Sequence, residues 1–145
     1  MPNEPLPLKL RRLHPAAVAP QSNHVGDAAL DLCGVETVIL EPMARAAIGI
    51  GWSIEFPSGY VGRILPRSGL ALHHGLQVLG GVIDSNYRGE WKVILINLGS
   101  DPVELKAGDR IAQAVFYPVA TIQLTEVEEL TDSTRGGDGF GSTGR

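Results

Sequence analysis

A chain of 145 residues, of which 43% are hydrophobic and 19% charged, holds enough apolar side chains for one folded domain and too many for a disordered chain. Its net charge of −4 excludes a general affinity for nucleic acid, so basic groups that bind an anionic ligand must be gathered locally. The longest apolar runs are too short for a membrane span or a signal peptide, and the single cysteine, Cys33, excludes an internal disulfide; we expect a cytoplasmic protein with neither membrane nor nucleic acid as a partner.

The chain has 18 glycines and 10 prolines, which divide it into short segments. This frequency favours short strands joined by tight turns. Residues 52–65, WSIEFPSGYVGRIL, alternate apolar and polar side chains on either side of a PSGY turn, which predicts a β-hairpin. Residues 68–75, SGLALHHG, offer one short helical turn. Residues 90–97, EWKVILIN, are apolar on both faces at their centre, as in a strand that is covered on both sides.

The remaining strand-like segments are PVELK, RIAQAVFYPV and the alternating run TIQLTEVEEL over residues 121–130. Since strands do not alternate with long helices, we predict an all-β sandwich or barrel. Beyond residue 130 the sequence TDSTRGGDGFGSTGR has no apolar period. We therefore divide the chain into a β body, residues 1–130, and a flexible, glycine-rich C-terminal arm, residues 131–145.

Two stretches of the body place polar groups beside strand ends. AALDLCG, residues 28–34, sets Asp31 between two leucines, and an exposed turn carboxylate is the simpler interpretation. In PRSGLA, residues 66–71, Arg67, Ser68 and Gly69 open the helical turn, whose free N–H groups and positive dipole end suit a phosphate. Ser68 as an ordinary N-cap explains the same residues equally well.

Two further stretches carry candidate chemistry. In GGVIDSNYRGE, residues 80–90, Asp84 ends an apolar run, where partial desolvation would suit a general base, and Tyr87 could form a pocket floor. A hairpin turn capped by Asp84 is the alternative. In GDRIAQAVF, residues 108–116, Arg110 and Gln113 interrupt an apolar strand, and an internal salt bridge is the favoured interpretation for Arg110.

The arm combines glycines with functional side chains. Successive glycines allow backbone N–H groups to line an anion site, and Arg135, Ser142 and Thr143 are residue types that bind phosphate. Phe140 offers a face on which a base can stack. A flexible tail is the commoner fate of such a segment.

Together, AALDL, PRSGLA, GVIDSNYRGE, GDRIAQ and RGGDGFGSTG resemble, in order, the five motifs of the trimeric dUTPases, the deoxyuridine triphosphate nucleotidohydrolases. The resemblance runs from Leu8 to Gly144. It implies a jelly-roll-like β body of the β-clip type and a homotrimer in which two chains build each active site and the arm of the third closes it. It also implies hydrolysis of dUTP to dUMP and pyrophosphate with Mg²⁺, which clears dUTP from the nucleotide pool and supplies dUMP for dTMP synthesis.

The same resemblance implies a role for each motif residue. Asp84 would be the general base that directs water onto the α-phosphorus, and Tyr87 would pack under the deoxyribose and exclude a 2′-hydroxyl. The implied contacts with uracil come from the backbone of Gly81, Val82, Ile83 and Asp84 and from Phe140, beside Gly141, which would stack over the base; Lys92 would contribute its backbone. The implied contacts with the phosphates come from Arg67, Ser68, Gly69 and Gln113. The terminal phosphates would be bound by Arg135, Ser142 and Thr143. Asp31 would support the metal indirectly, through water.

Two positions depart from the family pattern, and two other functions are open. Asn86 stands where an acidic residue is more usual, and Asp138 stands where glycine is common. We expect Asp138 to point away from a bound triphosphate. The alternative functions are a dCTP deaminase or bifunctional deaminase/dUTPase of the same superfamily, which needs a proton-shuttling glutamate, and a regulator that keeps the fold and binds a protein partner.

Overall fold

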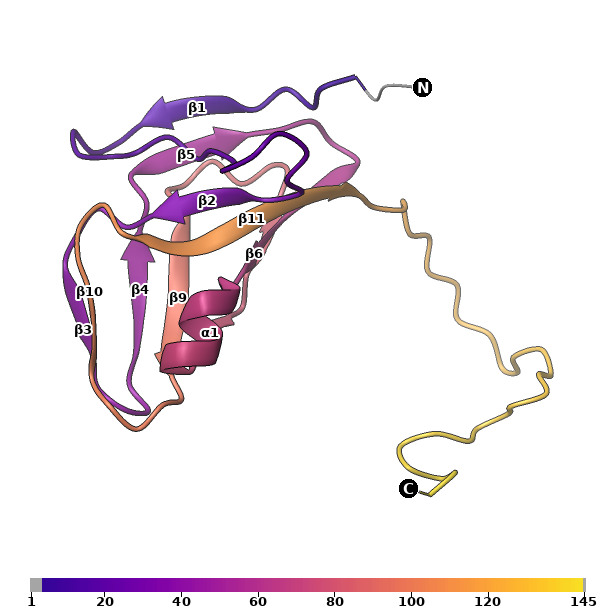
Figure 1. Cartoon of the computed structure of the whole chain (residues 1–145). Helices are drawn as coiled ribbons and strands as arrows, with labels where there is room; N and C mark the ends of the chain where they lie inside the picture. The colour runs from indigo at the N-terminus through magenta and orange to yellow at the C-terminus, as the bar shows by residue number, and fades with distance from the viewer. Residues whose placement is uncertain (1–3, 145) are drawn as a thin grey trace.

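The computed structural model describes residues 4–144, and within them the chain is all-β, as predicted. Figure 1 shows the strands gathered in one body, with the helix lying against it. The elements are β1 (Lys9–Arg12), β2 (Leu30–Cys33), β3 (Val38–Leu40), β4 (Arg45–Gly49), β5 (Trp52–Glu55), β6 (Tyr60–Leu65), α1 (Ser68–His74), β7 (Leu76–Leu79), β8 (Val82–Asp84), β9 (Lys92–Asn97), β10 (Val103–Leu105) and β11 (Arg110–Pro118).

The strands form two larger sheets, in the orders β2-β11-β6-β8 and β4-β9-β7, and two strand pairs, β1-β5 and β10-β3. Every pairing is antiparallel. Antiparallel neighbours need only short connections, which agrees with a chain divided by frequent glycine and proline. The long strand β11 lies inside the first sheet, between β2 and β6, and β2 and β8 are the two edge strands.

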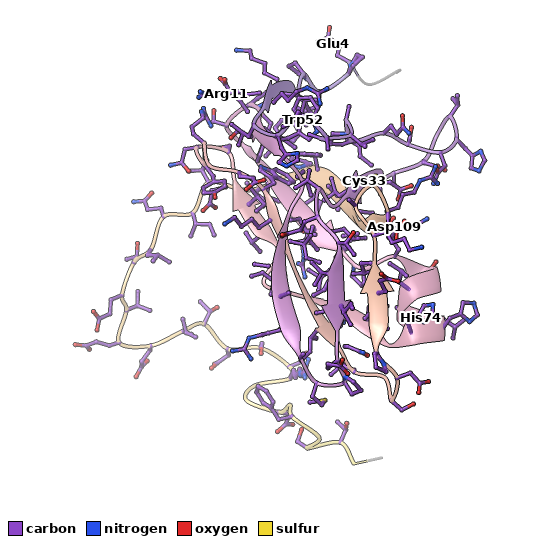
Figure 2. All side chains as sticks on the ribbon, turned by 90° about the vertical axis from the view of Figure 1, so that its left-hand side faces the viewer. Glu4, Arg11, Cys33, Trp52, His74 and Asp109 are labelled. Carbon is purple, nitrogen blue, oxygen red and sulfur yellow. The ribbon has the colours of Figure 1, made fainter. Side chains whose placement is uncertain are left out.

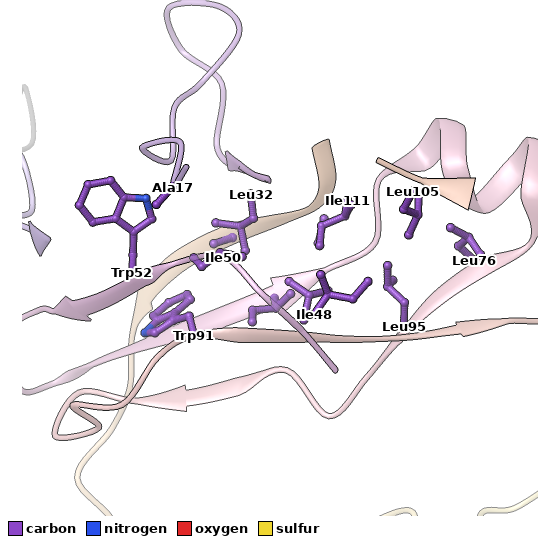
Figure 3. Packing of buried hydrophobic residues seen from close by; sticks show 14 of the residues in the cluster. Ala17, Leu32, Ile48, Ile50, Trp52, Leu76, Trp91, Leu95, Leu105 and Ile111 are labelled. Atoms are coloured by element: carbon purple, nitrogen blue, oxygen red, sulfur yellow. The ribbon is translucent and has the colours of Figure 1, made fainter. Parts of the chain in front are cut away.

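One hydrophobic core draws side chains from both larger sheets. Leu32 and Ile111 of the first sheet and Ile48 and Leu95 of the second are each at most 1% exposed. Figure 3 shows these four side chains within one cluster, with Leu32 and Ile111 above Ile48 and Leu95. The core also contains Trp91, which is fully buried. Burial of side chains of this size is the main favourable term that holds the two sheets together.

Aromatic rings fill the Trp91 end of the core. The Phe56 ring packs edge-on against Trp91 and Phe116, with ring centroids 6.3 and 5.1 Å away. Gly62 of β6 lies directly beneath the indole, and a Cβ atom there would come within 2.7 Å of Trp91 Cη2. Glycine is therefore required at position 62 for the close packing of β6 against Trp91.

The predicted hairpin over residues 52–65 is wrong, although both of its strands exist. β5 pairs with β1, whereas β6 pairs with β11 and β8. Phe56, only 3% exposed, leaves the end of β5 and enters the aromatic cluster, so the chain crosses from one sheet to another instead of folding back on itself. Alternation predicted the strands correctly and could not predict their partners.

The predicted helical turn over residues 68–75 is confirmed, with one difference at its start. α1 ends at Gly75, whose left-handed backbone (φ 71°) and N–H bond to the Ala71 carbonyl form the C-cap. The N-cap is Arg67, without a side-chain capping bond, so Ser68 is the first helical residue and not the cap. Within residues 4–144, no helix is long and apolar enough to cross a membrane.

Strand β9 has only one covered face, so the prediction of a strand covered on both sides is wrong for this chain. Val93 and Leu95 are fully buried, whereas Ile94, which points the other way, is 37% exposed. Side chains alternate across a strand, so this exposed apolar face belongs to the outside of the sheet β4-β9-β7.

The last strand ends at Pro118, and residues 119–144 contain neither helix nor strand. The alternating run over residues 121–130 is therefore not a strand here, because no strand lies beside it. Its apolar side chains stay in solvent, with Ile122 77% and Leu124 91% exposed. Figure 1 shows this segment leaving the body and extending well away from it.

Candidate active site

Asp31 organises the first group of predicted site residues. Strand β2 pairs with β11 so that Asp31 lies opposite Gln113, and the carboxylate is only 7% exposed. Asp31 Oδ1 lies 3.3 Å from Arg67 Nε, and Oδ2 lies 3.7 Å from Arg110 Nη1 and accepts a 2.7 Å hydrogen bond from Asn23 Nδ2. The simpler interpretation of Asp31 as an exposed turn carboxylate is wrong, whereas the internal salt bridge expected for Arg110 is confirmed.

We call Asp31, Arg67, Arg110 and Gln113 the Asp31 cluster. A buried carboxylate is stable only when it is paired, and here two guanidinium groups share one carboxylate. The cluster therefore keeps a surplus positive charge, and the Arg67 and Arg110 side chains remain 32% and 45% exposed. Their free N–H groups are available to an anion. Gln113 Nε2 donates to the Pro66 carbonyl at 2.9 Å, which fixes the chain just before Arg67.

Two further predicted residues stand at the start of α1, directly after Arg67. Ser68 and Gly69, the first two residues of α1, are exposed, and a Cβ atom on Gly69 would meet no described atom within 4 Å. A cavity of about 420 Å³ lies beside Arg67 and Arg110. Glu104 and Asp109 also line this cavity, so the two arginines of the Asp31 cluster have open space beside them that is not uniformly basic.

The second group of predicted residues lies on and beside β8. Val82, Ile83, Asp84, Tyr87 and Lys92 line one hollow of about 200 Å³, together with Glu90, and we call it the β8 pocket. Five of its six lining residues come from the sequence prediction. Glu90 was missed as a site residue even though it ends the quoted stretch GVIDSNYRGE.

Gly81 allows β8 to pair closely with β6. Gly81 has φ +99°, and its carbonyl accepts a 2.8 Å hydrogen bond from the Ile64 N–H. A Cβ atom on Gly81 would lie 2.6 Å from the Ile64 carbonyl oxygen, so only glycine allows this approach. The pairing then places Asp84 opposite Val61 at the end of the strand.

Asp84 and Tyr87 are both open to solvent in this chain. Asp84 is exposed, since β8 is an edge strand that pairs with β6 on one side and with no described strand on the other. The predicted partial desolvation of the Asp84 carboxylate is therefore wrong for the single chain. The turn after β8 closes through a 3.1 Å hydrogen bond from the Tyr87 N–H to the Asp84 carbonyl. The Tyr87 side chain is 43% exposed, and its hydroxyl donates to the Glu90 carbonyl at 3.0 Å.

The two groups do not meet within one chain. Along β6, Val61 pairs with Asp84 and Leu65 pairs with Gln113. Four residues of a strand span about 13 Å, and Arg67 lies further along the chain in the same direction. A single chain therefore presents the Asp31 cluster and the β8 pocket as two separate groups, and we call them the two candidate half-sites.

The predicted arm residues lie apart from both half-sites. Within the described residues, no hydrogen bond or ion pair joins residues 131–144 to the body. Arg135 Nε donates to the Asp138 carbonyl at 2.7 Å, and Phe140 is fully exposed. Figure 1 shows the chain of this segment running at a distance from the body. Gly141, Ser142 and Thr143 are not packed against it either, and Asn86 and Asp138 are exposed.

No metal centre is preformed among residues 4–144. Among the described residues, no group of three or more His, Cys, Asp or Glu side chains could hold a metal ion. All four histidines are exposed, and His74 projects from the end of α1 (Figure 2). Cys33 is buried as a free thiol, and burial raises the pKa of that thiol above its usual value of 9.0.

A model of the dUTPase family matches residues 16–144. The chain belongs to the dUTPase family. It is 49% identical over 140 residues to the deoxyuridine 5'-triphosphate nucleotidohydrolase of Wolinella succinogenes, covering 95% of this chain and 94% of that protein. Its identity to the Clostridium novyi protein of the same name is 48% over 139 residues, covering 94% and 98%. The resemblance inferred from the five motifs is thereby confirmed.

Solved dUTPases have the same fold. The dUTPase of Staphylococcus bacteriophage 80alpha with dUPNHPP superimposes with a TM-score of 0.90 at 31% identity, over 96% of this chain and 99% of that one. A variant dUTPase from phage phi11 of S. aureus, whose structure reveals the coordination of a structural Mg(II) ion, gives a TM-score of 0.82 at 29% identity, over 87% and 99%. The dUTPase fold of this chain therefore rests on sequence and structure together.

Proposed function

We propose that this dUTPase hydrolyses dUTP to dUMP and pyrophosphate, as a jelly-roll-like homotrimer with Mg²⁺. Membership of the family makes the chain a dUTP diphosphatase. The observation that carries the finer proposal is the β8 pocket, where Val82, Ile83, Asp84, Tyr87 and Lys92 line one hollow. In the cell, such an enzyme would clear dUTP from the nucleotide pool and supply dUMP for dTMP synthesis in the cytoplasm.

Asp84 is proposed to act as the general base. Its exposed carboxylate, at the end of β8, is open to a water molecule and can accept a proton from it. As the proton moves to Asp84, the water oxygen bonds to the α-phosphorus and the bond to the bridging oxygen breaks, so that pyrophosphate leaves with the bonding electrons. The reaction depends mainly on positioning and on neutralising charge.

Recognition of the nucleoside follows from the free edge of β8. One edge of this strand is bonded to β6, while the other has no partner strand among the described residues. Backbone N–H and C=O groups between Gly81 and Asp84 can therefore hydrogen-bond the edge of uracil. Tyr87 is proposed to lie under the deoxyribose, where its ring leaves no room for a 2′-hydroxyl. Lys92, on the strand β9 beside this pocket, would contribute its backbone.

The triphosphate is proposed to bind the Asp31 cluster. Arg67 and Arg110 share one carboxylate and keep free donors, Ser68 and Gly69 are exposed directly after Arg67, and Gln113 pairs with Asp31 across the sheet. Charge-assisted hydrogen bonds from guanidinium groups are the strongest contacts that a phosphate can make here. In this proposal the Asp31 cluster binds the phosphates, and the β8 pocket supplies Asp84 as the general base.

The residues of the Asp31 cluster fit a Mg²⁺ ion that arrives with the substrate. Mg²⁺ keeps several waters and binds phosphate oxygens, so a cage of protein ligands is not required. A carboxylate has about four acceptor positions, and Asp31 uses one of them on the hydrogen bond from Asn23, while Arg67 and Arg110 lie at ion-pair distance, which leaves capacity for a water. When bound, the ion would neutralise charge on the phosphates.

The homotrimer is supported by the separation of the half-sites. Since about 13 Å of β6 lies between them, a complete site needs the Asp31 cluster of one chain and the β8 pocket of another. The exposed face of β9 at Ile94 and the exposed Ile122 and Leu124 are apolar surfaces that neighbouring chains would cover. The arm, free of its own body, could then close the site of a third chain.

In that closed state, the arm residues would complete the site. Arg135, Ser142 and Thr143 are proposed to bind the terminal phosphates, and Phe140, beside Gly141, to stack over the uracil. The full exposure of Phe140 supports this, because a ring without packing on its own body is available to a ligand.

The deciding experiment is an assay of dUTP, dTTP, dCTP and UTP with Mg²⁺, in which dUMP and pyrophosphate are measured by chromatography. We expect strong preference for dUTP. Asp84→Asn should abolish turnover and leave nucleotide binding largely in place. Absence of dUMP would refute the proposal, and ammonia release from dCTP would identify a deaminase instead.

A further inference from the structure

Tyr87 is held by the residues that follow it in its own turn. A Cβ atom on Gly89 would lie 2.6 Å from Tyr87 Cζ, so the phenol ring lies directly on the glycine backbone. The Tyr87 hydroxyl donates to the Glu90 carbonyl at 3.0 Å. For the Tyr87 side chain, this is the one hydrogen bond recorded among the described residues. Because the ring is 43% exposed, its orientation depends on this contact and on the Gly89 surface.

The backbone that accepts this hydrogen bond is fixed to the body by Glu90 itself. Glu90 Oε2 accepts a hydrogen bond from the Gly51 N–H at 3.0 Å, across 39 residues of sequence. Gly49 leaves the space for this carboxylate, since a Cβ atom there would come within 2.5 Å of Oε2. Next along the chain, the Trp91 N–H donates to the Trp52 carbonyl at 2.9 Å. The acceptor of Tyr87 is thus tied to the β4–β5 connection and not only to its own turn.

We propose that Glu90 is a positioning residue that sets the selectivity of this enzyme for a 2′-deoxy sugar by holding Tyr87 in place. The inference rests on the proposed function, in which Tyr87 lies under the deoxyribose. Selectivity against a 2′-hydroxyl requires a ring that does not move aside. A tyrosine with one hydrogen bond keeps its rotamer only while the acceptor stays in place, and the Glu90 carboxylate, through the Gly51 N–H, supplies that constraint together with the Trp91 N–H of the same peptide unit.

The first test compares kcat/KM for dUTP and for UTP in Glu90→Ala and Glu90→Gln. Glu90→Ala should lower the ratio of dUTP to UTP by about threefold to tenfold, the effect of losing one hydrogen bond. Glu90→Gln should restore most of the ratio, because its amide oxygen can still accept from the Gly51 N–H. Glu41→Ala is the matched control, since this exposed carboxylate has no side-chain partner recorded among the described residues.

A double-variant cycle tests whether Glu90 acts through Tyr87. Tyr87→Phe removes only the hydroxyl that donates to the Glu90 carbonyl. If both variants loosen the same ring, the double variant should lose no more of the dUTP to UTP ratio than the larger single loss. Losses that multiply would overturn the proposal, because Glu90 would then act by another route.

Gly49→Ala covers the case in which Glu90→Ala does not fold. Its methyl group would displace the Glu90 carboxylate and leave the residue in place, so it should lower the ratio in the same way. A folded Glu90→Ala or Gly49→Ala protein with the parent ratio would overturn the role of Glu90. A parent protein that leaves dUTP intact would instead overturn the proposed function, and this inference with it.

Discussion

Mixing two inactive variants should restore activity if the two half-sites come from different chains. Arg67→Ala removes a charged donor from the Asp31 cluster, and Asp84→Asn removes the base from the β8 pocket. The two positions lie at opposite ends of β6, where about 13 Å separate the register partners of Asp84 and Gln113. Each variant alone should therefore be defective at every site of its own trimer.

The size of the recovery follows from the assembly. In trimers formed at random from equal amounts of both variants, half of the chains carry an intact Arg67 and half an intact Asp84. A site that takes these residues from different chains is complete in about a quarter of cases, so about a quarter of the parent activity should return. Across mixing ratios, activity should follow the product of the two fractions, with its maximum at equal amounts. Sites built within one chain would give no recovery at any ratio.

The assay needs mixed trimers of known composition. The two variants, distinguished by mass, would be unfolded together, refolded and examined by native mass spectrometry, and dUMP would then be measured with Mg²⁺. Parent protein treated in the same way corrects for refolding losses, and each variant refolded alone gives the background. Mixed trimers confirmed by mass that remain at that background would refute the shared site.

Three further predictions test the arm, the core and the buried thiol. Truncation before Arg135 should leave a folded trimer by light scattering that has lost most of its dUTP turnover; full activity would show that the arm is only a tail. Gly62→Ala should lower the free energy of unfolding by about 1–3 kcal/mol, because its methyl group would come within 2.7 Å of Trp91, and urea unfolding at fixed protein concentration measures it. Unchanged stability would contradict the packing argument. Burial raises the pKa of the Cys33 thiol above 9.0, so the folded protein keeps a proton that the unfolded chain releases. The stabilising effect is complete below about pH 9 and declines as pH rises above it. Cys33→Ala should remove that part of the decline, and an equal decline in both proteins would refute the assignment.

Residues close together in the sequence were predicted best. Val82, Ile83, Asp84 and Tyr87 share a pocket because a strand and its following turn hold them, and local sequence determines both. The same holds for the end of α1, where Gly75 takes the left-handed conformation that a glycine C-cap provides. Propensity and turn chemistry act over a few residues, so a single sequence is sufficient for them.

Contacts across the fold could not be predicted in this way. The sequence around Asp31 is typical of an exposed turn carboxylate. Its burial depends on two arginines from elsewhere in the fold, Arg110 of β11, which pairs with β2, and Arg67, which follows β6. Glu90 was missed for the same reason, since its partner, the Gly51 N–H, lies 39 residues away. The partner of a polar group depends on sheet order, and alternation along a strand contains no information on sheet order.

The two wrong predictions of strand environment have a common physical cause. Residues 90–97 and 121–130 both carry apolar side chains where the single chain leaves them exposed, at Ile94, Ile122 and Leu124. An apolar pattern predicts that a surface is buried, but it does not specify whether the same chain or a neighbouring chain buries it. In the proposed function, the half-sites divided along β6 would require a neighbouring chain for a reason that is independent of these surfaces, namely the distance between the proposed base and the proposed phosphate site. If the proposed trimer forms, one assembly both covers the exposed apolar faces and brings Asp84 to the phosphates, so association and catalysis would be selected together in this sequence.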